Sequence, residues 1–266
     1  TVTYTLAGMD NRDAGWGVAD ESWTVMDELG RLGGEDWFRL GDRDLATHLF
    51  RTGHLRAGEP LSAGTSLLTA RRGVGVRLLP VTDDPLRTRL TLAEATSLGP
   101  SGTEVAFQDY FVRLRHGVAV RGVRFEGAPS ARPAPGVMEA LDAAELIVVC
   151  PSNPVVSIGP LLAVPGIREA LTARRDRVVG VSPIVAGTAL KGPADRLMAE
   201  LGTEPSVTGV ARLYAPWVGT LVIDVADESR AGEVEAEGMR CVVADTIMSS
   251  PERAAALARV VVDALG

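Results

Sequence analysis

Short, continuous apolar runs alternate with helical stretches through the C-terminal half of the chain. Runs of this kind are typical of strands in a parallel sheet that is covered on both faces. We expect strands at residues 146–150, 177–181, 220–224 and 240–244, and helices at 165–174, 193–201, 206–214 and 251–265. The alternation of strand and helix predicts right-handed βαβ crossovers and an α/β fold built on a doubly wound parallel sheet.

The first 135 residues follow a less regular pattern of hydrophobic and polar positions. They predict helices at 20–32, 42–52 and 62–71, and strands at 76–81, 87–92 and 120–125. Residues 128–136 hold three prolines, which is typical of a linker. We therefore divide the chain into residues 1–135, an N-terminal part of the domain with an inserted α+β region, and residues 136–266, the βα core.

Composition and charge narrow the function classes. A hydrophobic share of 46% and a charged share of 23% are ordinary for a globular protein and exclude a disordered or fibrous chain. The 27 Lys and Arg residues against 34 Asp and Glu residues give a formal charge of −7, which argues against general binding of nucleic acid or of a membrane surface. Two cysteines, Cys150 and Cys241, form no metal-ligand spacing. Because no apolar run approaches about 18 residues and no signal peptide opens the chain, we expect a cytoplasmic protein.

Polar residues follow the first of the C-terminal strands, where ligands bind in folds of this class. The segment Pro-Ser-Asn-Pro-Val-Val-Ser-Ile-Gly at 151–159 brings Ser152, Asn153 and Ser157 beyond the carboxyl end of that strand. Their hydroxyls and amide can hydrogen-bond a ribose, a base edge or a phosphate. The same segment can be a turn whose side chains cap its own backbone. Position alone leaves both interpretations open.

The next strand ends in a second stretch of small and polar residues, at 181–192, which begins with Ser182 after the strand. Small residues such as Gly187 let backbone amides approach phosphate oxygens. Lys191 is the one lysine among the 27 basic residues and can supply a charge to a diphosphate. Two successive strand exits of this kind favour one shared cleft, and a plain βα loop with a surface lysine is the alternative. The stretch lacks the GxxxxGK[ST] frame of a P-loop.

A Gly-Asp-Arg-Asp segment at 41–44 stands at the start of the expected 42–52 helix. Asp42 and Asp44 would lie at the positive end of the helix dipole, and Arg43 between them can offer a guanidinium to a carbonyl or a phosphate. A helix N-cap with a salt bridge explains the same pattern, and the pattern alone favours it. The three histidines have no metal-ligand spacing and no Gly-x-Ser-x-Gly elbow is present, so zinc chemistry and serine hydrolysis are disfavoured.

A set of segments spread over nearly the whole chain carries a family resemblance. They are Thr-Val-Thr-Tyr-Thr-Leu at 1–6, Asp-Glu-Ser-Trp at 20–23, Trp-Phe at 37–38, Leu-Gly-Asp-Arg-Asp-Leu-Ala-Thr-His at 40–48, Leu-Pro at 79–80, Thr-Asp-Asp at 82–84, Ala-Pro-Gly at 134–136, the 151–159 segment, and Ser-Pro-Ile-Val at 182–185. In this order they resemble the 2-phospho-L-lactate transferase family of coenzyme F420 biosynthesis. The Gly-Asp-Arg-Asp and Pro-Ser-Asn-Pro blocks are specific only in combination.

The resemblance implies an enzyme with a Rossmann-like fold that depends on Mg²⁺ and forms a homodimer. Members of this family transfer a phospholactyl or phosphoenolpyruvyl group from a guanosine diphosphate conjugate to the terminal ribityl hydroxyl of the deazaflavin FO (7,8-didemethyl-8-hydroxy-5-deazariboflavin). GMP is released and (dehydro) coenzyme F420-0 is formed. The Arg- and Ala-rich composition resembles actinobacterial members, for which the enolpyruvyl donor is expected.

The resemblance also implies roles for individual residues. Arg43 matches the family's deazaflavin-contacting arginine, so we expect Arg43, Asp42 and Asp44 at the catalytic centre and the acceptor side within residues 1–135. On the donor side, the resemblance implies substrate-binding roles for the residues of the two strand exits: Ser152, Asn153, Ser157, Ser182, Pro183, Gly187 and Lys191.

The chain also departs from the family pattern. The family opens with a glycine-rich strand and loop and with acidic segments that contact the deazaflavin and hold the metal, and none of these is found in the sequence. Ala186 stands where the family usually has a glycine beside Gly187. We therefore expect the chain to be a fragment, and the metal ligands stay unknown. The rival function is that of a nucleotide- or UDP-sugar-binding regulator of the same fold without transferase activity.

Overall fold

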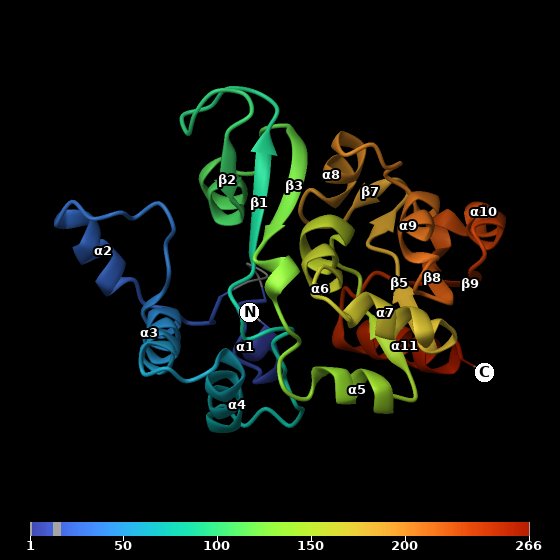
Figure 1. The fold of residues 1–266 in the computed structure, drawn as a ribbon, viewed down its shortest axis with the longest axis horizontal. Coiled ribbons are helices and arrows are strands. Elements are labelled where there is room, and N and C mark those ends of the chain that lie inside the picture. The colour runs from blue at the N-terminus through green and yellow to red at the C-terminus, as the bar shows by residue number, and fades with distance from the viewer. Residues whose placement is uncertain (1, 13–16, 266) are drawn as a thin grey trace.

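The computed structural model describes residues 2–12 and 17–265 and contains a four-stranded parallel sheet (Figure 1). Its strands lie in the order β4 (Ile147–Val149), β5 (Val178–Val181), β8 (Thr220–Asp224) and β9 (Arg240–Ala244). Gly180 of β5 pairs with Val149 of β4 on one side and Leu221 of β8 on the other. The four expected strands are present, and the α/β, Rossmann-like class is confirmed. Thr1, part of the first matching segment, lies outside the described residues.

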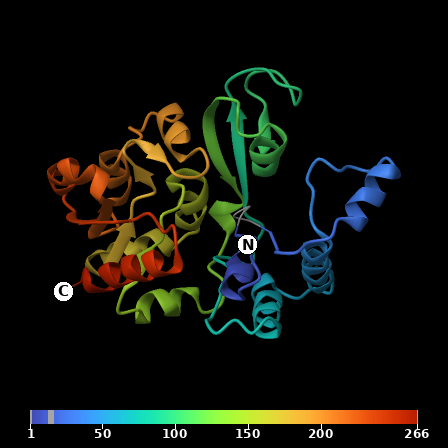
Figure 2. The same ribbon diagram turned by 180° about the vertical axis from the view of Figure 1, so that it is seen from behind.

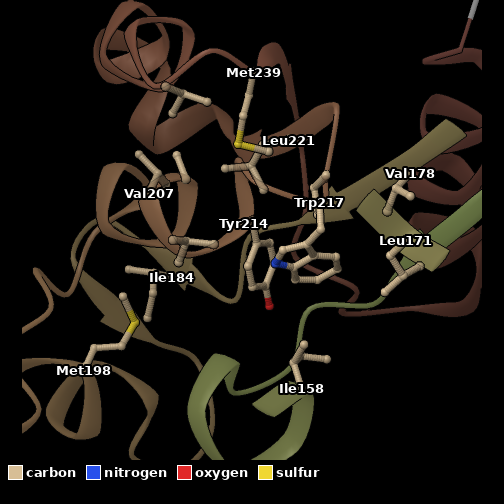
Figure 3. Close-up of a cluster of buried hydrophobic side chains, with 14 of the residues drawn as sticks. Ile158, Leu171, Val178, Ile184, Met198, Val207, Tyr214, Trp217, Leu221 and Met239 are labelled. Carbon is tan, nitrogen blue, oxygen red and sulfur yellow. The ribbon is translucent and has the colours of Figure 1, made fainter. Parts of the chain in front are cut away.

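Helices cover both faces of this sheet. On one face pack α7 (Ile167–Ala173), α9 (Val207–Tyr214) and α10 (Ala231–Ala236), and on the other packs α11 (Pro251–Asp263), seen in red in Figure 2. Tyr214 and Trp217 fill the first layer with their ring centroids 4.8 Å apart (Figure 3). Gly180 makes room for Tyr214, because a Cβ at this position would lie 3.3 Å from Cδ2 of Tyr214.

A second, antiparallel sheet stands beside the parallel one, at the top of Figure 1. Its order is β2 (Glu104–Ala106), β1 (Arg87–Leu92) and β3 (Val120–Glu126), and a single-turn π-helix, Asp109–Arg113, follows β2. Leu90, Leu92 and Tyr110 are fully buried in its core, together with Leu197 from α8 (Ala194–Glu200). Helix α8 therefore joins this sheet to the parallel core.

The N-terminal helices lie to the left of the parallel sheet in Figure 1: α1 (Val2–Leu6), α2 (Thr24–Arg31), α3 (Asp42–Arg56) and α4 (Leu61–Arg71). Tyr4 of α1 is buried, and its hydroxyl donates to Oδ1 of Asp44 at 2.5 Å. Arg72, just after α4, lies 5.2 Å from the centroid of the Tyr4 ring and donates to the hydroxyl of Thr47 at 2.7 Å. These contacts fasten α1 to α3 and α4.

Some elements differ from the sequence prediction. Residues 76–81, all of which the structure describes, form no strand, so that prediction is wrong. Pro80 in this stretch has no N–H to give to a ladder. The sequence pattern also did not predict several short elements. They are α1, α10, β2, the π-helix Asp109–Arg113, α5 (Val137–Ala143), α6 (Gly159–Leu162), β6 (Ile184–Val185), β7 (Thr188–Ala189), and the helical turns Ala128–Ser130, Pro154–Ile158, Arg175–Arg177 and Val225–Arg230. The domain boundary near residue 135 stays a prediction.

Among residues 2–12 and 17–265, no single helix is both long and apolar enough to cross a membrane. One bent pair, Pro154–Leu162 and Ile167–Ala173, meets the requirements of length and composition only when its two halves, which are 92° apart, are taken together.

Candidate active site

A cavity of about 1160 Å³ opens at the carboxyl ends of β4, β5 and β9. Residues from the loops after these three strands form much of its wall. The loops converge because the carboxyl ends of parallel strands meet at one edge of a sheet. The cavity is somewhat larger than the roughly 300–1,000 Å³ of most small-molecule sites, so it has room for a nucleotide with a further group attached.

The predicted donor-side residues converge on this cavity with one exception. Those that line it are Ser152, Asn153, Ser157, Ser182, Pro183 and Lys191. The two strand exits therefore share one cleft, as the sequence predicts, whereas the binding roles of these residues stay predictions.

Gly187 is the exception and does not appear among the lining residues of the described chain. Ala186 and Gly187 form the two-residue turn between β6 and β7, with φ values of 48° and 79°. A hairpin turn of this kind needs positive φ at both central positions, which glycine adopts freely and alanine only with strain. The N–H of Ala186 donates to Asp227 at 2.9 Å, so this amide is already occupied.

Asn153 has the capping role that the sequence left open. Its Oδ1 accepts hydrogen bonds from the N–H groups of Val155 and Val156 at 2.9 and 3.2 Å and begins the helical turn Pro154–Ile158. Its side-chain NH₂ makes no hydrogen bond to any residue that the structure describes and remains able to donate into the cavity. Capping and ligand binding are therefore compatible at this residue.

Ser182 shapes the second loop of the cavity. The residue is 2% exposed, and its hydroxyl donates to the carbonyl of Ile184 at 2.9 Å while accepting from the N–H of Ile184 at 3.1 Å. The hydroxyls of Ser152 and Ser157 have no such partner within residues 2–12 and 17–265. Both hydroxyls are therefore available to a ligand.

The loop after β9 belongs to the cavity although the sequence analysis assigned it no role. Thr246 lines the cavity and is fixed by Asp224, whose Oδ2 accepts from both the N–H and the hydroxyl of Thr246 at 2.9 Å. Burial alone would raise the pKa of Asp224, but the hydrogen bonds from Ala226 and Thr246 outweigh it and hold that pKa below the usual carboxyl range. The sequence contains a feature that could have predicted this role, because Ala-Asp-Thr-Ile-Met-Ser-Ser at 244–250 is a third polar segment that follows a strand.

Lys191 and Arg12 give the larger cavity its positive charge. Both are exposed, and neither side chain has an ion pair or hydrogen bond with the described part of the chain. Asp10 supplies a carboxylate to the same wall. The excess of cations favours an anionic ligand such as a diphosphate.

A second cavity, of about 460 Å³, lies on the other side of a shared wall. Helix α3 contributes Asp44, His48 and Arg51 to it. In α1, Tyr4 lines the smaller cavity and Thr5 the larger one. The wall continues in the segment 107–111, where neighbouring side chains again face different cavities.

Asp44 is the member of the Gly-Asp-Arg-Asp segment that faces the smaller cavity. The residue is 8% exposed, accepts the hydrogen bond from Tyr4 and lies 3.6 Å from Nε2 of His48. Burial and the hydrogen bond to Asp44 raise the pKa of Tyr4 to about 12, so Tyr4 remains a neutral donor. The structure thus holds the Asp44 carboxylate in one orientation.

Asp42 and Arg43 make their contacts with the chain itself. Asp42 accepts from the hydroxyl of Ser22 at 2.6 Å and from two N–H groups at the start of α2 at 3.0 and 3.1 Å, and these hydrogen bonds lower the pKa of Asp42. Nη1 of Arg43 donates to the carbonyl of Ala19 at 2.9 Å. Neither residue lines the two cavities described above, and their catalytic roles stay predictions.

Glu21, to which the sequence analysis assigned no role, holds the N-terminus of α3. Its carboxylate accepts from the N–H groups of Arg43 and Asp44, both at 2.9 Å. Gly41 makes room for it, because a Cβ at that position would lie 2.2 Å from Cδ of Glu21. The Gly-Asp-Arg-Asp segment is therefore a helix start, but its capping carboxylate comes from upstream, and Arg43 forms no salt bridge with the residues that the structure describes.

Within the residues that the structure describes, no group of three or more His, Cys, Asp or Glu side chains is placed to hold a metal ion. Mg²⁺ is commonly bound through one or two carboxylates together with substrate phosphates. Asp10 is such a carboxylate on the wall of the larger cavity. These residues do not form a metal site by themselves.

Comparisons with known proteins give one family and one fold. The profile of the family described as 2-phospho-L-lactate transferase CofD matches residues 1–263. Two similar proteins are named phosphoenolpyruvate transferase: one from Streptomyces griseus, 47% identical over 262 residues (97% of this chain, 81% of the relative), and one from Mycolicibacterium smegmatis, 39% identical over 267 residues (100% and 81%). The crystal structure of a UPF0052-family protein from Bacillus halodurans matches with a TM-score of 0.58 and 14% identity, over 98% of this chain and 81% of that one. At that identity the structural likeness concerns the fold alone.

Proposed function

The chain belongs to the CofD family of 2-phospho-L-lactate transferases, which act in coenzyme F420 biosynthesis, and on this premise we propose its reaction. It transfers a phospholactyl or phosphoenolpyruvyl group from a guanosine diphosphate conjugate to FO, forming (dehydro) coenzyme F420-0 and releasing GMP. Because its relatives are named phosphoenolpyruvate transferases, the phosphoenolpyruvyl donor is the favoured one.

The observation that carries the proposal is the pair of cavities on two sides of one wall. The larger one lies at the strand ends, carries Lys191 and Arg12, and has room for the guanosine donor. The smaller one lies against α3 and holds Asp44 and His48, on the side where the resemblance puts the acceptor. Two substrates that react with each other need adjoining sites, and these two cavities adjoin along α1 and residues 107–111.

The proposed reaction needs positioning and charge stabilisation more than covalent help from the protein. The terminal hydroxyl of FO attacks the phosphorus that carries the lactyl or enolpyruvyl group, and a new P–O bond forms. The bond from that phosphorus to the bridging oxygen breaks, GMP leaves with this oxygen, and the hydroxyl proton is released. Lys191 and Arg12 offset the charge that develops on the leaving GMP, and the hydroxyls of Ser152 and Ser157 orient the phosphates.

Mg²⁺, a homodimer and a cytoplasmic location are proposed with the reaction and rest on the family resemblance. When bound, Mg²⁺ would offset phosphate charge. We expect a chelator to abolish turnover and added Mg²⁺ to restore it. Sedimentation of the protein at several concentrations tests the dimer.

Turnover with both substrates tests the function directly. The full-length protein is incubated with FO and either guanosine diphosphate conjugate, and GMP and the mass of the deazaflavin product are followed. We expect GMP release only when FO is present, with the product gaining the enolpyruvyl or lactyl phosphate. Nucleotide binding without turnover of either donor would refute the transferase and favour the rival regulator, for which titration with a UDP-sugar is the positive test.

Asn153 offers a matched pair of variants that separates donor binding from folding. Aspartate caps a helix as well as asparagine does, so Asn153→Asp keeps the cap but replaces the amide donor by a negative charge against the phosphates. We expect it to melt like the wild type and to bind GDP about tenfold more weakly in calorimetry. Asn153→Ala should lose the cap as well, at a cost of about 1 kcal/mol of stability. Wild-type GDP affinity in Asn153→Asp would leave Asn153 as a cap only.

A further inference from the structure

Two stacked phenylalanines form one side of the larger cavity. The rings of Phe107 and Phe111 have centroids 5.3 Å apart and planes inclined by 20°, and both residues are half-buried and line the cavity. On their other side they pack against the buried core of the antiparallel sheet. They therefore present an apolar, aromatic surface to a cavity whose other walls carry hydroxyls and cations.

The backbone of this segment is irregular at the point where it brings the two rings into their stack. Phe111 lies in the π-helix Asp109–Arg113 and Phe107 lies just before it, four residues earlier. Gln108, between them, lines the smaller cavity. Single π-helical turns are costly irregularities that occur frequently at functional sites.

The turn after the π-helix is strained and supports the platform from behind. Arg115 and His116 have φ values of 50° and 42°, so two successive residues other than glycine adopt the left-handed conformation. Such strain persists only where the surroundings hold it. The N–H of His116 donates to the carbonyl of Tyr110 at 2.8 Å, and its ring centroid lies 5.0 Å from that of Phe111.

Arg196 of α8 locks this arrangement to the parallel core. Its Nη2 donates to the hydroxyl of Tyr110 at 2.5 Å and also to the carbonyl of His116. Helix α8 follows directly on the stretch that contains Lys191. The first residue of the helix, Ala194, lines the same cavity. One helix thus fixes the aromatic surface relative to the cationic side of the cavity.

We propose that Phe107 and Phe111 are a stacking platform for the planar heteroaromatic ring of a substrate. The inference rests on the proposed function, which brings two such rings to the protein: the guanine of the donor and the deazaflavin of the acceptor. Aromatic side chains bind the flat faces of bases of any sequence in this way. Because the platform faces the larger cavity, where Lys191 and the strand exits converge, the geometry favours guanine.

The test measures how three ligands bind to three variants of the protein. The ligands are GDP, inorganic pyrophosphate, which has no ring, and FO. Phe111→Leu removes the flat face but keeps an apolar side chain, and Phe111→Tyr keeps the ring. The matched control is Phe125→Leu, a half-buried ring of β3 that lines neither of the two cavities.

We expect Phe111→Leu to weaken GDP binding at least about fivefold, the lower end of base–aromatic stacking, and to leave pyrophosphate binding unchanged. Phe111→Tyr and Phe125→Leu should bind GDP like the wild type. Loss of FO affinity instead of GDP affinity would support the platform and assign its ring to the acceptor.

Three results would overturn the proposal. The first is a folded Phe111→Leu, checked by its thermal melt, that binds GDP and FO like the wild type. The second is a loss of pyrophosphate affinity as large as that of GDP, and the third is an equal loss in Phe125→Leu. All three leave the proposed function standing, whereas a wild-type protein that binds neither GDP nor FO would remove both.

Discussion

Asp224→Asn tests how the wall of the larger cavity is held in place. Asp224 is 3% exposed and accepts three hydrogen bonds, from the N–H of Ala226 at 3.0 Å and from the N–H and hydroxyl of Thr246, both at 2.9 Å. Whichever way the new amide turns, its NH₂ faces at least one of these donors. A buried donor left without its charged acceptor costs about 2 kcal/mol of unfolding free energy. For a chain of this length that lowers the melting temperature by about 4–8 °C.

The stability lost in Asp224→Asn depends on pH, and the pKa of Asp224 gives the direction of that dependence. The hydrogen bonds hold the pKa of Asp224 below its ordinary value in the folded protein. Its stabilising contribution is therefore complete above the unfolded-state pKa of about 4 and is lost as the pH falls through the folded-state value. Urea unfolding of wild type and Asp224→Asn should show the full difference at pH 7 and a smaller one at pH 3.

The matched control for this experiment is Asp176→Asn, because the side chain of Asp176 is 82% exposed. We expect this control to unfold like the wild type at both pH values. A loss in Asp224→Asn below about 0.5 kcal/mol at pH 7, where even a single net hydrogen bond would register, would refute the reasoning. So would a loss that does not shrink at pH 3.

Three further variants test other parts of the site. Ala186→Gly should raise the unfolding free energy by about 1 kcal/mol, because it relieves a left-handed alanine, and a lower melting temperature would contradict this. Arg43→Lys should raise the Michaelis constant for FO by roughly 10- to 150-fold and leave that for the donor near wild type, since lysine cannot reproduce a planar fork; a stable variant with unchanged FO kinetics would reject the acceptor role. Gly41→Ala should displace Glu21 from α3 and cost about 1–2 kcal/mol in urea unfolding, so wild-type stability would show that this cap contributes nothing.

The parallel sheet was predictable because each of its strands is a continuous apolar run with a polar exit. The strands Thr220–Asp224 and Arg240–Ala244 begin and end at the predicted residues. The β6–β7 hairpin and the π-helix were not predictable, because elements this short have no periodicity and depend on contacts from elsewhere. The contact from Asp227 to the hairpin turn is one such contact.

The candidate site was predictable for residues that follow the end of a strand, because the strand fixes where they lie. Asn153 and Ser182 reach the cavity because each follows shortly after the carboxyl end of a strand of the parallel sheet. The position of Glu21 at the N-terminus of α3 depends on how a distant segment folds back, which no local pattern records. Phe107 and Phe111 resemble ordinary core residues in the sequence, and only the cavity on their free side indicates a further role.

The attachment of the π-helix to α8 bears on the order in which the protein folds. Arg196 and Tyr110 are 86 residues apart in sequence, whereas β1, β2 and β3 pair with one another inside the range 87–126. Local pairing precedes distant docking, because closing a long loop costs entropy before the new contacts compensate for it. We therefore expect the two sheets to form separately and the wall that bears Phe107 and Phe111 to be completed last. The side of the cavity that is built from loops of the parallel core would then be present before its aromatic side.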